Sequence, residues 1–325
     1  MNTEEKMEAA IELFSQGQPA EALKIFSEIV AEDETNAQAA YFQGCALADA
    51  GDHENAVVAY EKSAKHAGER AALPLYHLGN SYQALGDLPK AALSFNAALE
   101  ADPTMADAWI NLGRVLDDMG NSETAVQCYD AALQIDPNDT VAHANRGNSL
   151  RQLDRFDEAL QCFTLALECE NPELPAYLGQ AICFVHTGEK EKGFDALDKI
   201  YEATQNATVL FEKGVLLGLQ DDNEEALAAF DQVLAENYHS PQLFNNRAEV
   251  LAKLTRVDEA LESFDQSLEL ENNFYPALFG KCRLLSKLDR IDEARATCER
   301  LLEICSDEQK ERPEIAALAQ RCGLT

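Results

Sequence analysis

The stretch of sequence that decides the fold is residues 106–139, which read ADAWINLGRVLDDMGNSETAVQCYDAALQIDPND. Both halves carry apolar residues at helical spacing, and the pair Gly120-Asn121 between them favours a turn. We therefore predict two amphipathic helices joined by a short turn. Gly113 on the first helix allows close approach of the second, and Tyr129, one turn beyond Ala125, fills the space that remains.

The same pattern recurs nine times along the chain, which makes it an internal repeat. A small residue returns at steps of 33 to 35 residues: Ala10, Gly44, Gly79, Gly113, Gly147, Ala181, Gly214, Ala248 and Cys282. Sixteen residues after each lies a residue that is bulky in eight of the nine repeats: Phe26, Tyr60, Phe95, Tyr129, Phe163, Leu197, Phe230, Phe264 and, as the exception, Cys298. One helix pair cannot bury both of its faces, so successive pairs are expected to stack.

Composition and charge narrow the class of partner. The 325 residues include 58 acidic and 26 basic ones, for a formal net charge of −32. Nucleic acids and anionic membranes bind clustered Lys and Arg, and no such cluster is present, so neither is a predicted partner. A basic protein segment would be steered towards an acidic surface. The alternative is that the charge only maintains solubility.

Cysteine usage predicts a reduced, cytoplasmic compartment. The nine cysteines include no CxxC pair, and an odd number cannot form a closed set of disulfides. The N-terminus lacks the basic start and apolar run of a signal peptide. Uncharged stretches such as residues 174–188 are too short to span a bilayer. We therefore predict a soluble protein.

The repeat resembles the tetratricopeptide repeat family. Residues 106–139 match its pattern with Trp109-x2-Leu112-Gly113-x2-Leu116, then Ala125-x3-Tyr129, then Pro137. The resemblance implies an all-α fold, a right-handed α-solenoid superhelix of tandem helix-turn-helix repeats that forms a single domain over residues 1–325. The expected repeats are residues 3–36, 37–70, 72–105, 106–139, 140–173, 174–206, 207–240, 241–274 and 275–308, with a capping helix at 312–323.

A search of the sequence for catalytic motifs finds none. No phosphate-binding glycine loop, HExxH or GxSxG motif is present. The histidines show no metal-ligand spacing to one another or to cysteine: His53, His66, His77, His143, His186 and His239. His143 takes the place of Trp109 in its repeat, which favours a packed position. We predict a protein that is not an enzyme and that has no cofactor and no metal site.

The family resemblance places ligands along the inner wall, which the first helix of each repeat builds. Residues before and after the signature glycine lie three apart, on one helical face. Asparagine amides both donate and accept, so they suit a peptide backbone. The predicted peptide-binding groove, which we call the polar wall, consists of His77, Asn80, Gln83, Asn111, Arg114, Asn145, Asn148 and Arg151. The alternative is that these exposed amides bond only to water.

Further along the chain the equivalent positions are apolar. This apolar wall consists of Leu178, Ile182, Val185, Phe211, Val215 and Leu219. It is interpreted as a pocket for an apolar side chain of the partner, as a self-association surface, or as ordinary packing between helices.

The predicted function is therefore a protein-interaction scaffold that binds an extended peptide or protein segment in the groove of repeats three to seven. The alternative is a self-assembling structural or regulatory subunit of a larger complex or of an enzyme. The sequence leaves the oligomeric state open.

Overall fold

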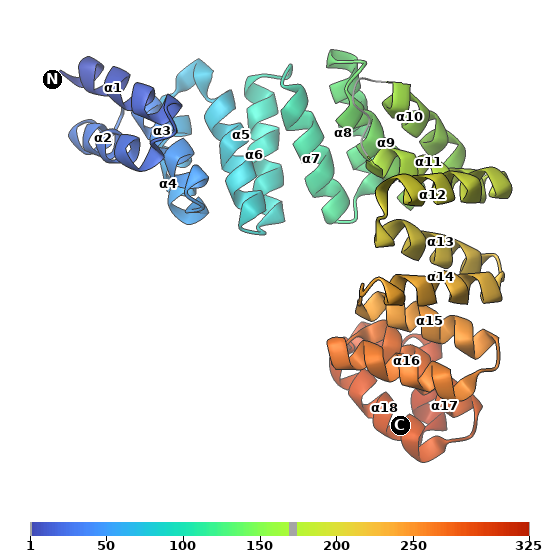
Figure 1. Cartoon of the computed structure of the whole chain (residues 1–325). Coiled ribbons are helices and arrows are strands. Elements are labelled where there is room, and N and C mark those ends of the chain that lie inside the picture. Colours follow the sequence, from blue (N-terminus) through green and yellow to red (C-terminus); the bar gives the residue numbers. More distant parts are fainter. Residues whose placement is uncertain (1, 169–173, 325) are drawn as a thin grey trace. The chain divides into compact units, whose positions relative to one another are not determined.

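The computed structural model describes residues 2–168 and 174–324, and the described residues form helices and no strands (Figure 1). The helices pair into hairpins, and we call the first helix of each repeat helix A and the second helix B. Their bounds are α1 Thr3–Ser15, α2 Pro19–Glu32, α3 Ala37–Asp49, α4 His53–His66, η1 Gly68–Arg70, α5 Ala72–Ala84, α6 Leu88–Ala101, α7 Ala106–Asp118, α8 Ser122–Ile135, α9 Thr140–Gln152, α10 Phe156–Glu168, α11 Leu174–His186, α12 Lys190–Thr204, α13 Ala207–Leu219, α14 Asn223–Ala235, α15 Pro241–Lys253, α16 Val257–Leu270, α17 Tyr275–Lys287, α18 Ile291–Ile304, α19 Asp307–Lys310 and α20 Pro313–Arg321.

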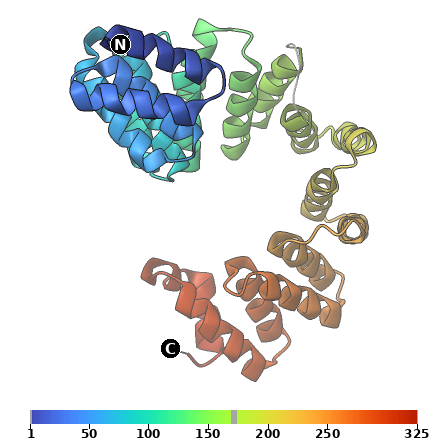
Figure 2. The same cartoon turned by 60° about the vertical axis from the view of Figure 1, so that its left-hand side comes forward.

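The chain divides into two compact units. The first unit is Met1–Thr187 and holds α1 to α11, and the second unit is Gly188–Thr325 and holds α12 to α20. Within each unit the helices stack in chain order, so that each hairpin lies against the next (Figure 2). The division falls inside predicted repeat six, whose helices are α11 and α12.

Helix A of each repeat lies on the inner side of the stack. In the first unit α3 contacts α5, α5 contacts α7, and α7 contacts α9; in the second unit α13 contacts α15, and α15 contacts α17. Among the described residues no two successive B helices pack together in this way. Elements on the inner side of a curved stack lie closer together than those outside. The A helices therefore form the inner wall, as the family resemblance implies.

In five of the nine repeats the contact that closes the hairpin is an aromatic ring of helix B over a glycine of helix A. A Cβ atom built on Gly113 would lie 2.7 Å from Cε1 of Tyr129, and one built on Gly79 would lie 2.6 Å from Cε1 of Phe95. Both rings are fully buried. A Cβ atom cannot approach a ring this closely, so glycine lets the ring lie against helix A at these positions.

The same ring also contacts the next repeat. Phe42, two positions before Gly44, stacks on Phe26 of the preceding repeat with the ring centroids 5.5 Å apart. His77 stacks on Tyr60 at 5.7 Å in the same way. Each ring thus lies between its own helix A and the following one, and it holds neighbouring repeats together as well as the two helices of one repeat.

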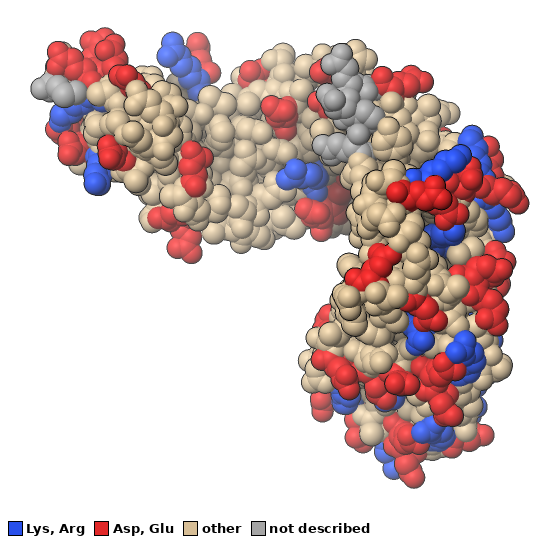
Figure 3. Space-filling view, viewed as in Figure 1, with Lys and Arg blue, Asp and Glu red and all other residues tan. Residues whose placement is uncertain are grey.

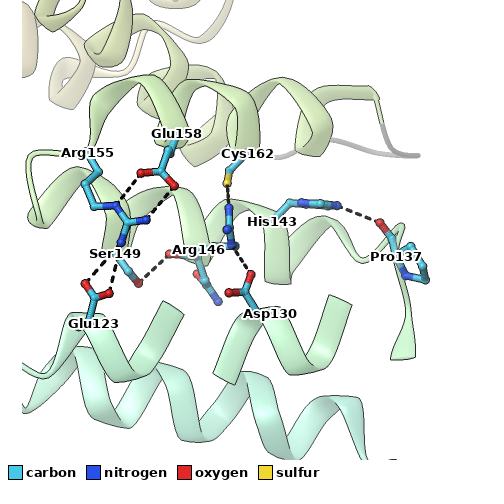
Figure 4. Close-up of polar contacts among 10 residues, drawn as sticks. Glu123, Asp130, Pro137, His143, Arg146, Ser149, Arg155, Glu158 and Cys162 are labelled. Atoms are coloured by element: carbon cyan, nitrogen blue, oxygen red, sulfur yellow. Dashed lines mark hydrogen bonds and ion pairs between the residues drawn. The ribbon is translucent and has the colours of Figure 1, made fainter. Parts of the chain in front are cut away.

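Beside this ring, an Arg or Lys of helix A pairs with an Asp on helix B of the preceding repeat at four places. Arg146 Nε donates to Asp130 Oδ1 at 2.6 Å, and its Nη1 contacts Cys162 Sγ at 2.7 Å (Figure 4). Arg247 repeats the arrangement in the second unit, with Asp231 at 2.7 Å and Ser263 Oγ at 2.6 Å. Lys213 with Asp198 and Lys281 with Asp265 form the same link.

The ends and irregular points of the stack follow the sequence. Ala71 lies between the predicted repeats 37–70 and 72–105 as one extra residue, and the short helix η1 between α4 and α5 accommodates it. At the C-terminal end α20 covers repeat nine with Ile315, Ala319 and Cys322, which are all buried. None of the helices in the described part of the chain has the length and apolar character needed to cross a membrane.

We expect Gly113→Ala to destabilise the protein by about 1–2 kcal/mol. Overpacking of a buried ring costs about 1–3 kcal/mol, and the helix propensity of alanine returns up to about 1 kcal/mol of this. Urea unfolding followed by circular dichroism measures the change. Gly218→Ala is the matched control, because its Cβ would lie 3.4 Å from Val250 Cγ2, an ordinary contact. Equal unfolding midpoints for the two variants would contradict the role of the ring contact.

Candidate functional site

The polar wall lies entirely within the first unit, on three successive A helices. His77, Asn80 and Gln83 come from α5, Asn111 and Arg114 from α7, and Asn145, Asn148 and Arg151 from α9. Arg114 is exposed, and the other seven side chains are half-buried. Because α5 contacts α7 and α7 contacts α9, the structure brings these residues onto neighbouring helices of one inner wall.

Two asparagines of the wall contact each other directly. Asn111 Nδ2 donates to Asn80 Oδ1 at 3.0 Å and to the hydroxyl of Tyr76 at 3.1 Å. Both hydrogens of the Asn111 amide are therefore used inside the protein. Within the described residues no group donates to Asn111 Oδ1, and none accepts from Asn80 Nδ2. The pair thus presents one acceptor and one donor, which is the set that a peptide group requires.

His77 has a packing role at the edge of this wall. Its ring lies 5.7 Å from the ring of Tyr60, 5.6 Å from Tyr41 and 5.2 Å from Tyr76. Burial lowers the pKa of His77 below its ordinary value of 6.5, while the carboxylate of Asp49 acts weakly in the opposite direction. The imidazole is therefore neutral at neutral pH and offers no cation to a ligand.

Asp117 is a wall residue that the sequence prediction missed. Its Oδ2 accepts from Ser149 Oγ at 2.6 Å and from the Tyr129 hydroxyl at 3.1 Å. Its Oδ1 is buried without a hydrogen-bond partner among the described residues, and the same is true of Nε of Arg151. Asp117 occupies in repeat four the position of Gln83 and Arg151, since 34 residues separate each from the next. The 34-residue spacing from Gln83 and Arg151 is the sequence signal that could have identified Asp117 as a wall residue.

His143 lies in a packed position, at the edge of the repeat rather than on the wall. Its Nε2 lies 2.9 Å from the carbonyl oxygen of Pro137 (Figure 4). Trp109 makes the equivalent contact one repeat earlier, with Nε1 donating to the Pro103 carbonyl at 3.0 Å. Both rings fasten the start of helix A to the loop before it.

The apolar wall is divided between the two units. On α11 of the first unit, Ile182 and Val185 are buried and Leu178 is half-buried. On α13 of the second unit, the Phe211 ring packs against Phe230 with centroids 6.0 Å apart, and Leu219 is 64% exposed.

A small cavity adjoins the exposed end of α13. It measures about 150 Å³, and Val215 and Leu219 of the apolar wall contribute to its lining. The remaining lining residues are Gly214, Gly218, Phe230, Asn246, Glu249, Val250 and Lys253. The cavity is too small to enclose more than one side chain of a partner, since binding pockets for drug-sized ligands are about 300–1,000 Å³.

Charge is unevenly distributed over the first unit. On the face shown in Figure 3, charged side chains crowd over α1 and α2, whereas the surface over α5 to α7 is largely uncharged. The second unit shows acidic and basic side chains interspersed on the same face. The acidic net charge of the chain is thus concentrated away from the middle of the first unit on this face.

Comparison with protein families agrees with this architecture. Models of the tetratricopeptide repeat match residues 7–72, 76–140, 145–208 and 211–273, and two further models of the same repeat match residues 128–161 and 251–322. These matches extend over most of the chain. The chain belongs to the tetratricopeptide repeat family.

Solved structures of similar fold include a tetratricopeptide repeat protein from Parabacteroides merdae, with a TM-score of 0.60 at 18% identity, covering 87% of this chain and 98% of that one. Yeast Tom70 also gives a TM-score of 0.60, at 12% identity, covering 97% of this chain and 88% of Tom70. YrrB, described as a TPR protein with an unusual peptide-binding site, gives 0.51 at 24% identity, covering 57% of this chain and 94% of YrrB. No curated protein matches the sequence.

The lowered pKa of His77 predicts a pH dependence of stability. Folding favours the neutral imidazole, so this stabilisation is complete above the unfolded pKa of about 6.5 and is lost as the pH falls through it towards the folded pKa. His77→Phe keeps a ring on Tyr60, as Phe42 does on Phe26, but cannot titrate. We expect its melting temperature to fall less than that of the wild type between about pH 7.5 and about pH 5.5. An NMR pKa of His77 at or above 6.5 would refute this account.

Proposed function

We propose that this chain is a non-enzymatic protein-interaction scaffold that holds an extended segment of another protein along the polar wall of the first unit. Members of the tetratricopeptide repeat family generally bind protein or peptide partners, and the family match covers most of this chain. The observation that carries the proposal is the set of unsatisfied donors and acceptors on α5, α7 and α9.

These groups suit a peptide backbone in chemistry and in spacing. Asn111 Oδ1 and Asp117 Oδ1 accept, and Asn80 Nδ2 and Arg151 Nε donate. Packed helices lie about 8–10 Å apart, and an extended peptide advances about 3.3 Å per residue. One repeat therefore spans about three peptide residues. The buried Asp117 Oδ1 and Arg151 Nε are costly to leave unpaired, so a peptide whose binding brings either atom into a hydrogen bond gains free energy.

The partner segment is proposed to be basic. The compartment of this chain is proposed to be the reducing cytoplasm. The net charge of −32 favours the approach of a cationic segment. Free thiols are consistent with the cytoplasm: the eight cysteines in the described residues form no disulfide, and seven of them are buried. The expected affinity is micromolar, about −8 kcal/mol, because ordering a flexible peptide offsets much of the contact energy.

The double substitution Asn111→Ala and Asn145→Ala tests the binding proposal. Peptides are first selected on the immobilised wild type from a random display library, and their dissociation constants are then measured by fluorescence polarisation. Loss of two amide contacts is expected to weaken binding about tenfold, or about 1.4 kcal/mol. Added salt is expected to weaken it further if the selected peptides are basic.

The control for this experiment is Asn96→Ala on α6. The Asn96 side chain is exposed and donates to the Ala92 carbonyl of its own helix at 3.0 Å, so it has no place on the inner wall. Unfolding curves confirm that each variant remains folded. Wild-type affinity in the double variant, or a selection that yields no peptides, would count against the polar wall as the binding surface.

A second candidate function is self-association through the second unit, which the exposure of Leu219 favours. Leu219→Asp would place a charge on this surface, and light scattering across concentration is expected to show the mass of a single chain. Phe211→Asp serves as the contrast, because the Phe211 ring packs on Phe230 and the variant should lose helix content instead. A wild type that is monomeric at all concentrations excludes this candidate.

A further inference from the structure

Repeat nine closes without an aromatic ring. Cys282 stands at its signature small position, and Cys298 stands where seven of the other eight repeats carry an aromatic ring. A third cysteine, Cys322, follows α20 and completes the cluster from the C-terminal cap. All three are 0% exposed. Three buried thiols therefore lie together where repeat nine meets the cap.

The three sulfur atoms converge on one point. All Sγ atoms lie within 4.8 Å of one another, and they come from α17, α18 and the residue that ends α20. A metal at about 2.3 Å from each sulfur places the sulfurs about 4 Å apart in a planar three-coordinate arrangement. Small side-chain movements are enough to reach that geometry from the distances present.

The chemistry of the ligand set selects the kind of metal. Thiolates are soft ligands that select Cu(I), zinc or iron–sulfur clusters. In the described residues no histidine or carboxylate joins the group, so a fourth protein ligand is absent there. Structural zinc sites close with four ligands, and three-ligand zinc sites keep a water in the fourth position. The full burial of the sulfurs leaves a three-coordinate, dry site, which Cu(I) accepts.

A basic side chain lies beside the thiol cluster. The guanidinium of Arg295 donates from Nε to the Cys322 carbonyl at 2.8 Å, and its charge lies close to the cluster. Cu(I) binds the three sulfurs as thiolates and displaces their protons to solvent. No electron is transferred, because the metal enters as Cu(I).

We propose that Cys282, Cys298 and Cys322 form a three-coordinate binding site for a soft monovalent cation, Cu(I), and that the bound cation fastens the C-terminal cap to repeat nine. Binding requires α17, α18 and α20 to be folded together, so the cation stabilises the second unit by mass action. The site is independent of the polar wall, which lies in the first unit.

The full-length reduced chain is titrated without oxygen with Cu(I) in the presence of the chelator bathocuproine disulfonate. The expected result is one equivalent of Cu(I) retained per chain, near-ultraviolet thiolate-to-copper absorption, and a raised melting temperature. Cys322→Ala and Cys282→Ala should each lose the retained copper and the thermal shift. Cys282→Ala is expected to fold, because Ala10, Ala181 and Ala248 occupy the same place in other repeats.

Cys128→Ala is the matched control, since Cys128 is a buried cysteine of α8 outside the cluster and its loss should leave copper binding unchanged. X-ray absorption of the copper-bound chain should show three sulfur neighbours. The proposal is overturned if the chelator removes all copper from the wild type, or if Cys322→Ala and Cys282→Ala retain it. One equivalent of Zn(II) bound in place of Cu(I), or a fourth nitrogen or oxygen neighbour, would overturn the three-coordinate assignment.

Discussion

The regular repeats depend on one kind of contact, an aromatic ring of helix B packed against the small signature residue of helix A, which is glycine in five repeats. The ring of Tyr129 on Gly113 sets how closely the two helices of a repeat approach. A ring at the same position also packs against helix A of the next repeat, as Tyr60 packs against His77. Burial of the ring between two A helices therefore couples the fold of one repeat to its neighbour. It also places successive A helices side by side, which is what makes a shared inner wall.

The regular part of this arrangement could be predicted from the sequence, because the ring, the glycine and the turn are local features with a fixed period. The helix pairs and the family follow from that period. Asp117 could not be recognised by residue type, since the search followed amides and Asp117 breaks the run of Gln83 and Arg151 with a carboxylate. Its importance appears only when the structure shows an oxygen buried without a partner.

Other features were not predictable because they depend on contacts between repeats. The pairs Asp130 with Arg146 and Asp231 with Arg247 are each separated by 16 residues, a distance that no single helix can bridge. The thiol cluster joins residues 282, 298 and 322, whose spacing in the sequence matches no metal-binding motif. They meet only because α17, α18 and α20 pack together. The boundary between the two units, at Thr187 and Gly188, lies inside the one predicted repeat of 33 residues, but the shortened repeat alone does not show that the stack divides there.

The turns between helix A and helix B have a consequence for how these repeats can change. Some of these turns use glycine for the left-handed backbone, as Gly120 does with φ of +78°, whereas Asp154, Asp221, Thr255 and Asp289 adopt φ of 58°, 62°, 61° and 59° without being glycine. A left-handed backbone costs a non-glycine residue roughly 1–2 kcal/mol, and a β-branched residue such as Thr255 is an outlier there. The repeats that contain these turns are thus held below their attainable stability. Sequence drift at these turns can therefore alter the thermal tolerance of the protein.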